Sequence, residues 1–219
     1  MAPGQGPSTP PENSFPHAID ARYRCLGILG KGSSGSVYKA FDSQLQREVA
    51  IKFIHRREHE ERTRLLNEAR VLAQLEHPHI CKVYEVAEEG EAVYLVMSFV
   101  NGPHLNVWRE QFSDRQLVQT IADVAGALHS AHLQGIVHCD VKPSNIVLRQ
   151  NKDAVQAVLV DFGIAHGGIY SATLSGVGTQ HYMAPERFSQ SEADTSPKEP
   201  LSLSLQLIFT PLALPCALF

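Results

Sequence analysis

The chain has 219 residues, with 19 lysine and arginine against 23 aspartate and glutamate residues, so its formal net charge is −4. Hydrophobic residues make up 43% of it, which excludes a wholly disordered or collagen-like chain. The length suits one domain or two small lobes, and the mildly acidic balance argues against a dedicated nucleic-acid binder. No CxxC pair occurs, which favours a reducing, cytoplasmic location over a disulfide framework for Cys25, Cys81, Cys139 and Cys216.

The first predicted elements are strands. Residues 1–21 are rich in proline and glycine and predict a disordered leader, without the basic and apolar segments of a signal peptide. Beyond them, Tyr23–Leu29 and Ser36–Phe41 flank a glycine-rich turn and predict a hairpin. Glu48–Ile54 predicts a third strand.

A helix is predicted over 59–75, because apolar residues recur there at helical spacing, and His77-Pro78 would end it. Two further strands are predicted at Ile80–Val86 and Ala92–Val100, and residues 101–103 mark a break. The chain to this point therefore reads as five strands and one helix.

After the break the pattern becomes mainly helical. Residues Asp114–Gln134 predict a long helix with one apolar face, and Ser113 or Asp114 would cap its start. Two short apolar stretches follow, at Ile146–Leu148 and Val155–Val160.

Three features of the first part indicate binding of an anion. Residues 30–37 form a GxGxxGxV pattern between two strands, where glycines let the backbone approach phosphates, although a simple hairpin turn is the alternative. Lys52, inside the apolar strand, needs an anionic partner unless it lies at a strand edge. Glu68 lies on the helical face that would reach Lys52, with Glu61 as its rival and local pairing with Arg64 as the alternative.

The second part carries acidic, basic and amide groups at close spacing. In the segment 138–145, Asp140, Lys142 and Asn145 suit a hydroxyl nucleophile, a phosphate and a metal ion. Asp161 follows an apolar strand directly and precedes Phe162-Gly163, a suitable place for a ligand of a hard metal ion. Two further short motifs follow, Gly178-Thr179 and Ala184-Pro185-Glu186.

These six motifs, in this order, resemble the signature of eukaryotic-like (Hanks-type) serine/threonine protein kinases, and most closely their bacterial members. The resemblance covers residues 22–188. It implies an α+β fold of two lobes. Residues 22–100 would form a five-stranded antiparallel N-lobe with one helix, and residues 101–188 a mainly helical, incomplete C-lobe.

The resemblance also implies ATP and Mg²⁺ as cofactors and a protein serine or threonine hydroxyl as the acceptor. Asp140 would orient that hydroxyl and accept its proton, and Lys142 would neutralise the γ-phosphate. Asn145 and Asp161 would hold Mg²⁺. The nucleotide would be bound by Gly30, Lys31, Gly32, Gly35, Val37, Ala50, Lys52, Glu68, Met97, Ser98 and Val100.

The sequence departs from the family in two places. Cys139 replaces the usual arginine of the catalytic loop, which predicts no strict dependence on phosphorylation of the activation segment. After Glu186 the family pattern ends, and the uncharged residues 201–219 predict an atypical tail over 189–219, as in a truncated product. A divergent lobe or a short membrane span are the alternatives, and the span is disfavoured by two internal prolines. The alternative function is therefore an inert kinase fragment that binds nucleotide or a partner.

Overall fold

The computed structural model describes residues 15, 19, 21–32, 35–54, 59–89, 92–151 and 154–162. Several predicted features lie outside these residues: leader residues 1–14, loop residues 33–34, Gly163, the motifs at 178–179 and 184–186, and the tail 189–219.

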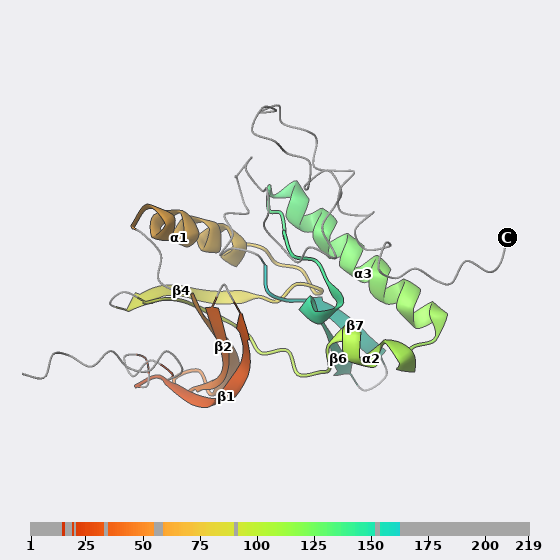
Figure 1. Ribbon diagram of the computed structural model, residues 1–219, viewed down its shortest axis with the longest axis horizontal. Helices are drawn as coiled ribbons and strands as arrows, with labels where there is room; N and C mark the ends of the chain where they lie inside the picture. Colours follow the sequence, from red (N-terminus) through yellow and green to blue (C-terminus); the bar gives the residue numbers. More distant parts are fainter. Residues whose placement is uncertain are drawn as a thin grey trace, which may run out of the picture.

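The first part of the chain forms a five-stranded antiparallel sheet with the strand order β1-β2-β3-β5-β4. The helix α1 lies over the sheet beside β4 (Figure 1). This confirms the predicted architecture of five strands and one helix. The strands and helix are β1 (Tyr23–Gly32), β2 (Gly35–Asp42), β3 (Arg47–Ile54), α1 (His59–Ala73), β4 (Val83–Glu89) and β5 (Ala92–Ser98).

The apolar residues whose spacing predicted α1 form the face by which this helix packs on the rest of the protein. Leu65, Ala69 and Leu72 are buried in the main hydrophobic core. The helix ends at Ala73, two residues before the predicted end, and Leu75 is buried just beyond it.

The predicted start of the fourth strand was wrong by three residues. The strand was expected from Ile80, but β4 begins at Val83. Ile80 instead forms an isolated parallel bridge with Leu159, in the second part of the chain. The apolar residues near 80 are thus buried between the two parts rather than within the first sheet.

The second part combines one long helix with a hairpin that lies beside it (Figure 1). Ser113, one of the two caps that the sequence offered, caps the long helix α3 in a capping box with Gln116. No helix among the described residues is both long and apolar enough to cross a membrane. The elements are α2 (Leu105–Trp108), the 3-10 helix η2 (Arg109–Gln111), α3 (Asp114–Leu133), the 3-10 helix η3 (Pro143–Asn145), β6 (Ile146–Asn151) and β7 (Ala154–Leu159).

Two described residues of the predicted leader contact the outer face of the sheet. Ile19 is buried, and the ring of Phe15 meets those of Tyr38 and Phe53 edge-on at centroid distances of 5.4 and 5.6 Å. The composition of residues 1–21 did not predict this packing. Arg22 follows directly and bonds to Glu85 of β4 at 2.8 Å, so the chain entering β1 is held against the sheet.

A short segment, residues 79–82, joins the two parts. The backbone of Leu159 donates to the His79 carbonyl at 2.8 Å and accepts from the Cys81 N–H at 2.9 Å. At the other end of the segment, the Ser98 N–H donates to the Lys82 carbonyl at 2.8 Å. Hydrogen bonds therefore connect β7 to the end of β5 through four residues.

Candidate active site

Lys52 is carried by β3, a strand that is buried on both faces. Val49, Ile51 and Phe53 enter the outer core together with Tyr38 and Tyr94, so the alternate residues Ala50 and Lys52 face the second part of the chain. The Lys52 side chain is only 6% exposed, and its ammonium forms an ion pair with the carboxylate of Asp161. The anionic partner expected for this lysine is thus a residue more than a hundred positions away.

Asp161 lies just beyond β7, where the chain turns. Its backbone has φ +59°, in the left-handed region, which turns the residue sharply out of the strand direction. The preceding residue is held in place, because the Val160 N–H donates to the Asn145 carbonyl at 2.9 Å. The Asp161 side chain is 39% exposed and bonds to Lys52 through Oδ1. It is therefore directed toward β3 and remains accessible.

The loop before β6 brings the other three predicted groups together. The carboxylate of Asp140 meets the Lys142 ammonium at 2.6 Å. The amide Nδ2 of Asn145 donates to the Asp140 carbonyl oxygen at 2.8 Å and to its Oδ2 at 3.2 Å. Pro143 begins the single turn of η3 that closes this loop. One carboxylate oxygen is thus shared by a cation and an amide.

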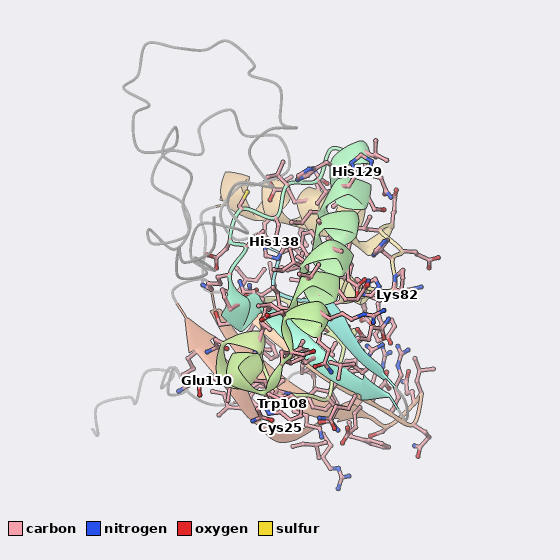
Figure 2. The ribbon with its side chains drawn as sticks, turned by 90° about the vertical axis from the view of Figure 1, so that its right-hand side faces the viewer. Cys25, Lys82, Trp108, Glu110, His129 and His138 are labelled. Carbon is pink, nitrogen blue, oxygen red and sulfur yellow. The ribbon has the colours of Figure 1, made fainter. Side chains whose placement is uncertain are left out.

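His138 supports this loop from inside the molecule, and sequence reasoning did not assign it a role. Its side chain lies in the interior, whereas Lys82 lies at the surface (Figure 2). Its Nε2 donates to the Val160 carbonyl at 3.1 Å, and its Nδ1 accepts from the Asp140 N–H at 3.3 Å. Burial lowers the pKa of His138 to about 4, so the ring is neutral at pH 7. Its position two residues before Asp140 was the only sequence signal for its importance.

His138 also connects the two acidic residues. It bonds to the backbone of Asp140 on one side and to that of Val160, the neighbour of Asp161, on the other. Its ring meets that of Phe162 at a centroid distance of 4.4 Å. The buried imidazole, together with Asn145, therefore helps to fix the relative placement of Asp140 and Asp161.

The glycine-rich residues lie where β1 turns into β2. A Cβ added to Gly30 or Gly32 would meet no atom within 4 Å, so the backbone there is open to a ligand. Gly35 differs, because a Cβ on it would lie 1.9 Å from the Phe53 carbonyl oxygen. Lys31, between the first two glycines, has an exposed side chain.

The strand register places the remaining predicted nucleotide residues near Lys52. Val37 of β2 pairs with Lys52, and Ala50 pairs with Met97 of β5. Ser98 ends β5, and Val100 is buried two residues later. The predicted nucleotide residues on three adjacent strands are therefore neighbours.

Glu68 lies on the inward face of α1, in keeping with its predicted place. The residue is only 8% exposed, and it lies between the buried Leu65 and Leu72. The side chains of its alternatives, Glu61 and Arg64, lie outside the described ones. The pairing of Glu68 with Lys52 stays a prediction.

The donor set suits a magnesium ion. The amide nitrogen of Asn145 donates to Asp140, so the oxygen Oδ1 is the atom of this amide that can ligate a metal ion. The exposed carboxylate of Asp161 bonds to Lys52 through one oxygen and retains a second. Amide and carboxylate oxygens are the ligands that Mg²⁺ prefers, so Asn145 and Asp161 fit the ion.

Comparison with known proteins identifies the class of protein. Residues 23–208 match the family model described as "Protein kinase domain". The chain belongs to this family.

Several of the curated relatives that match it are serine/threonine-protein kinases of bacteria. The chain is 35% identical over 195 residues to the probable serine/threonine-protein kinase pknA2 of Bifidobacterium longum, covering 83% of this chain and 25% of that protein. It is 36% identical over 185 residues to PknE of Mycobacterium bovis, covering 78% of this chain and 31% of that protein. The chain therefore spans about a quarter to a third of the length of these relatives.

Solved structures show the same fold. The match to Rad53 in complex with AMP-PNP has a TM-score of 0.65 at 27% identity and covers 80% of this chain and 44% of that one. The match to the kinase domain of Mycobacterium tuberculosis PknI has a TM-score of 0.60 at 28% identity, over 73% and 67% of the two chains. The expected α+β protein-kinase fold, with its five-stranded antiparallel N-lobe and incomplete helical C-lobe, is thereby confirmed.

Proposed function

We propose that this chain transfers the γ-phosphate of ATP to serine or threonine hydroxyls of a protein substrate. The observation that carries the proposal is the grouping of Asp140, Lys142 and Asn145 through contacts of 2.6 to 3.2 Å. Asp161 and Lys52 are linked to that group through the Val160 backbone and an ion pair. Phosphoryl transfer requires positioning and neutralisation of charge more than covalent chemistry, and these side chains supply both.

Each side chain has a proposed part. Asp140, held by Asn145, accepts a hydrogen bond from the acceptor hydroxyl, orients its oxygen and takes up its proton. Lys142 lies at the same carboxylate and neutralises the negative charge of the transferred group. Lys52 holds the α- and β-phosphates, and its ion pair with Asp161 is exchanged for contacts with them.

Mg·ATP supplies the phosphoryl group, and the bound ion neutralises charge on its phosphates. Asn145 Oδ1 and Asp161 would hold the ion. The open backbone of Gly30 and Gly32 covers the phosphates through its N–H groups, while Val37 and Ala50 contact the base. Met97, Ser98 and Val100 border the base on the side of β5.

Intact-mass measurement tests the proposal. The purified chain is incubated with Mg·ATP and a generic protein acceptor, and both masses are followed over time. We expect mass to be added in steps of one phosphate, and Asp161→Asn to abolish the additions. Asp114→Asn, which makes the same change at the exposed start of α3, is the matched control and retains them.

The same experiment separates the alternative of an inert fragment. Binding of Mg·ATP without any added mass in folded protein would support a nucleotide-binding or interaction module. Absence of Mg·ATP binding would contradict the kinase and the nucleotide-binding module, and would leave only the module that binds a partner.

We further propose the extents and context of the domain. The kinase domain covers residues 22–188, with the lobes meeting near residue 101, and residues 1–21 and 189–219 flank it. The chain acts in the cytoplasm on protein substrates, without nucleic-acid or membrane partners. The net charge of −4 and the scattered cysteines support this location.

A further inference from the structure

Ser98, the last residue of β5, is held by a set of contacts from the segment 81–82. Its N–H donates to the Lys82 carbonyl at 2.8 Å, and its hydroxyl accepts from the Lys82 N–H at 3.2 Å. The thiol of Cys81 donates to the Ser98 carbonyl at 3.3 Å and lies 3.4 Å from its hydroxyl. We call these three residues the hinge cluster.

The donors and acceptors of the hinge cluster complete one another. The Ser98 hydroxyl already accepts from Lys82, so its own proton is available for the Cys81 sulfur, while the thiol proton points to the Ser98 carbonyl. In this arrangement the Cys81 thiol donates to the Ser98 carbonyl, and its sulfur accepts from the Ser98 hydroxyl. Burial raises the pKa of Cys81, which keeps the thiol protonated and able to donate.

The surroundings make this arrangement rigid. Cys81 is buried in a cluster with Val100, Val147 and Val158, against which Met97 packs. Its backbone N–H is bonded to Leu159, two residues before Asp161. The cluster therefore connects the base side of the proposed nucleotide site to β7, the strand that precedes Asp161.

We propose that Cys81 and the hydroxyl of Ser98 are positioning residues, which set the backbone after β5 for recognition of the adenine base. This inference rests on the proposed function, because it requires nucleotide binding at Met97–Val100. Neither side chain needs to touch the nucleotide. They act by fixing the direction of the Ser98 carbonyl and of the peptide units that follow it.

Nucleotide binding by the full chain tests this proposal without requiring turnover. The dissociation constants of Mg·ATP and Mg·GTP are measured by calorimetry for the unmodified chain and for Cys81→Val, Cys81→Ser and Ser98→Ala. Valine retains the apolar packing of Cys81 but removes the donor, whereas serine restores a donor. Cys25→Val, at an exposed cysteine of β1, is the matched control.

We expect Cys81→Val and Ser98→Ala each to weaken Mg·ATP binding by about fivefold, as expected for loss of one net hydrogen bond. Mg·GTP binding should change less, so discrimination between the two bases falls. Cys81→Ser should restore part of this discrimination. In the double variant the effects should be less than additive, since both changes remove the same contacts.

Three outcomes would overturn the proposal. The first is Mg·ATP binding equal to that of the control in both variants. The second is an equal loss of affinity for Mg·ATP and Mg·GTP in the variants, together with a lower melting temperature that Cys81→Ser also shows. That result would indicate a general loss of stability of the fold. The third is failure of the unmodified chain to bind Mg·ATP, which refutes the proposed function and this inference with it. This outcome is distinguished from the first two because it is seen in the unmodified chain, before any variant is measured.

Discussion

Asp42 connects the start of the domain to the turn between β2 and β3, and its replacement by asparagine tests how the sheet is held. The carboxylate has no exposed surface. It accepts from Arg22 Nε at 3.3 Å and Nη2 at 3.0 Å, and from the backbone N–H groups of Gln44 and Leu45 at 3.0 and 3.1 Å. Burial disfavours its ionised form, but these hydrogen bonds outweigh burial and hold the pKa of Asp42 below its ordinary value.

Asn at this position keeps the shape of the side chain but turns an amide N–H₂ toward the Arg22 guanidinium. One charge-assisted hydrogen bond is then lost, and such bonds contribute about 1.5–3 kcal/mol. Because the Arg22 side chain is 28% exposed, water replaces part of that interaction. We expect Asp42→Asn to lower the free energy of unfolding by about 2 kcal/mol at pH 7. For a domain of this size that lowers Tm by about 4–8 °C.

Urea denaturation followed by circular dichroism provides the measurement. Glu48→Gln is the matched control, since Glu48 lies across the same turn and makes an exposed ion pair with Lys39 at 2.7 Å. Exposed pairs contribute about 0–1 kcal/mol, so the control should change little. A loss in Asp42→Asn no larger than that of the control would refute the reasoning.

The pH dependence gives a second check on Asp42. A carboxyl whose folded pKa is depressed stabilises the fold above its unfolded pKa, about 3.9, and this stabilisation is lost as the pH falls through the lower folded pKa. The difference between the unmodified chain and Asp42→Asn should therefore be constant from pH 7 to about 5 and shrink in more acidic solution. A difference that persists unchanged at pH 3 would contradict the assignment.

Three further predictions concern the site and the junction between the lobes. Asn145→Ala should lower kcat by a larger factor than it changes the KM for ATP, because Asp140 loses two hydrogen bonds. Steady-state kinetics in which only KM changed would refute this. The buried His138 has its pKa lowered to about 4, so the fold should lose stability as the pH falls from about 6.5 toward 4, by about 3 kcal/mol. This slope should be absent from denaturation curves of His138→Gln. Gly102→Ala should destabilise the fold by about 1–3 kcal/mol, since its Cβ would lie 2.1 Å from the Leu148 carbonyl oxygen, and an unchanged urea midpoint would show that the backbone moves freely there.

The elements were predictable because their signals are local. The period of apolar residues in 59–75 and 114–134 indicated the two long helices, and α1 and α3 occupy those segments to within two residues at each end. The alternation in Glu48–Ile54 indicated β3. The error at Ile80 has a physical cause, because an apolar residue between two lobes has the same local pattern as one within a strand.

The candidate site was predictable from the sequence only as a set of residue types. The motifs placed Asp140, Lys142 and Asn145 in one loop, where their spacing of two and three residues makes contact natural. The same spacing carried no information on His138, because a histidine in a loop has no periodicity to reveal its burial. Its role follows from its two hydrogen bonds, to the backbone of Asp140 and to that of Val160, which lie 20 positions apart in the sequence.

The sequence by itself determined the family, the order of the elements and the chemical groups available for phosphoryl transfer. These depend on residue identity and on contacts within a few positions along the chain. Only the tertiary structure decided that Lys52 meets Asp161, that Phe15 packs on the sheet, and that Cys81 bonds to Ser98. Such contacts join segments from 17 to 109 positions apart. They arise from burial of apolar faces, both between the two lobes and on the outer face of the sheet, and local patterns do not record which distant face a residue meets.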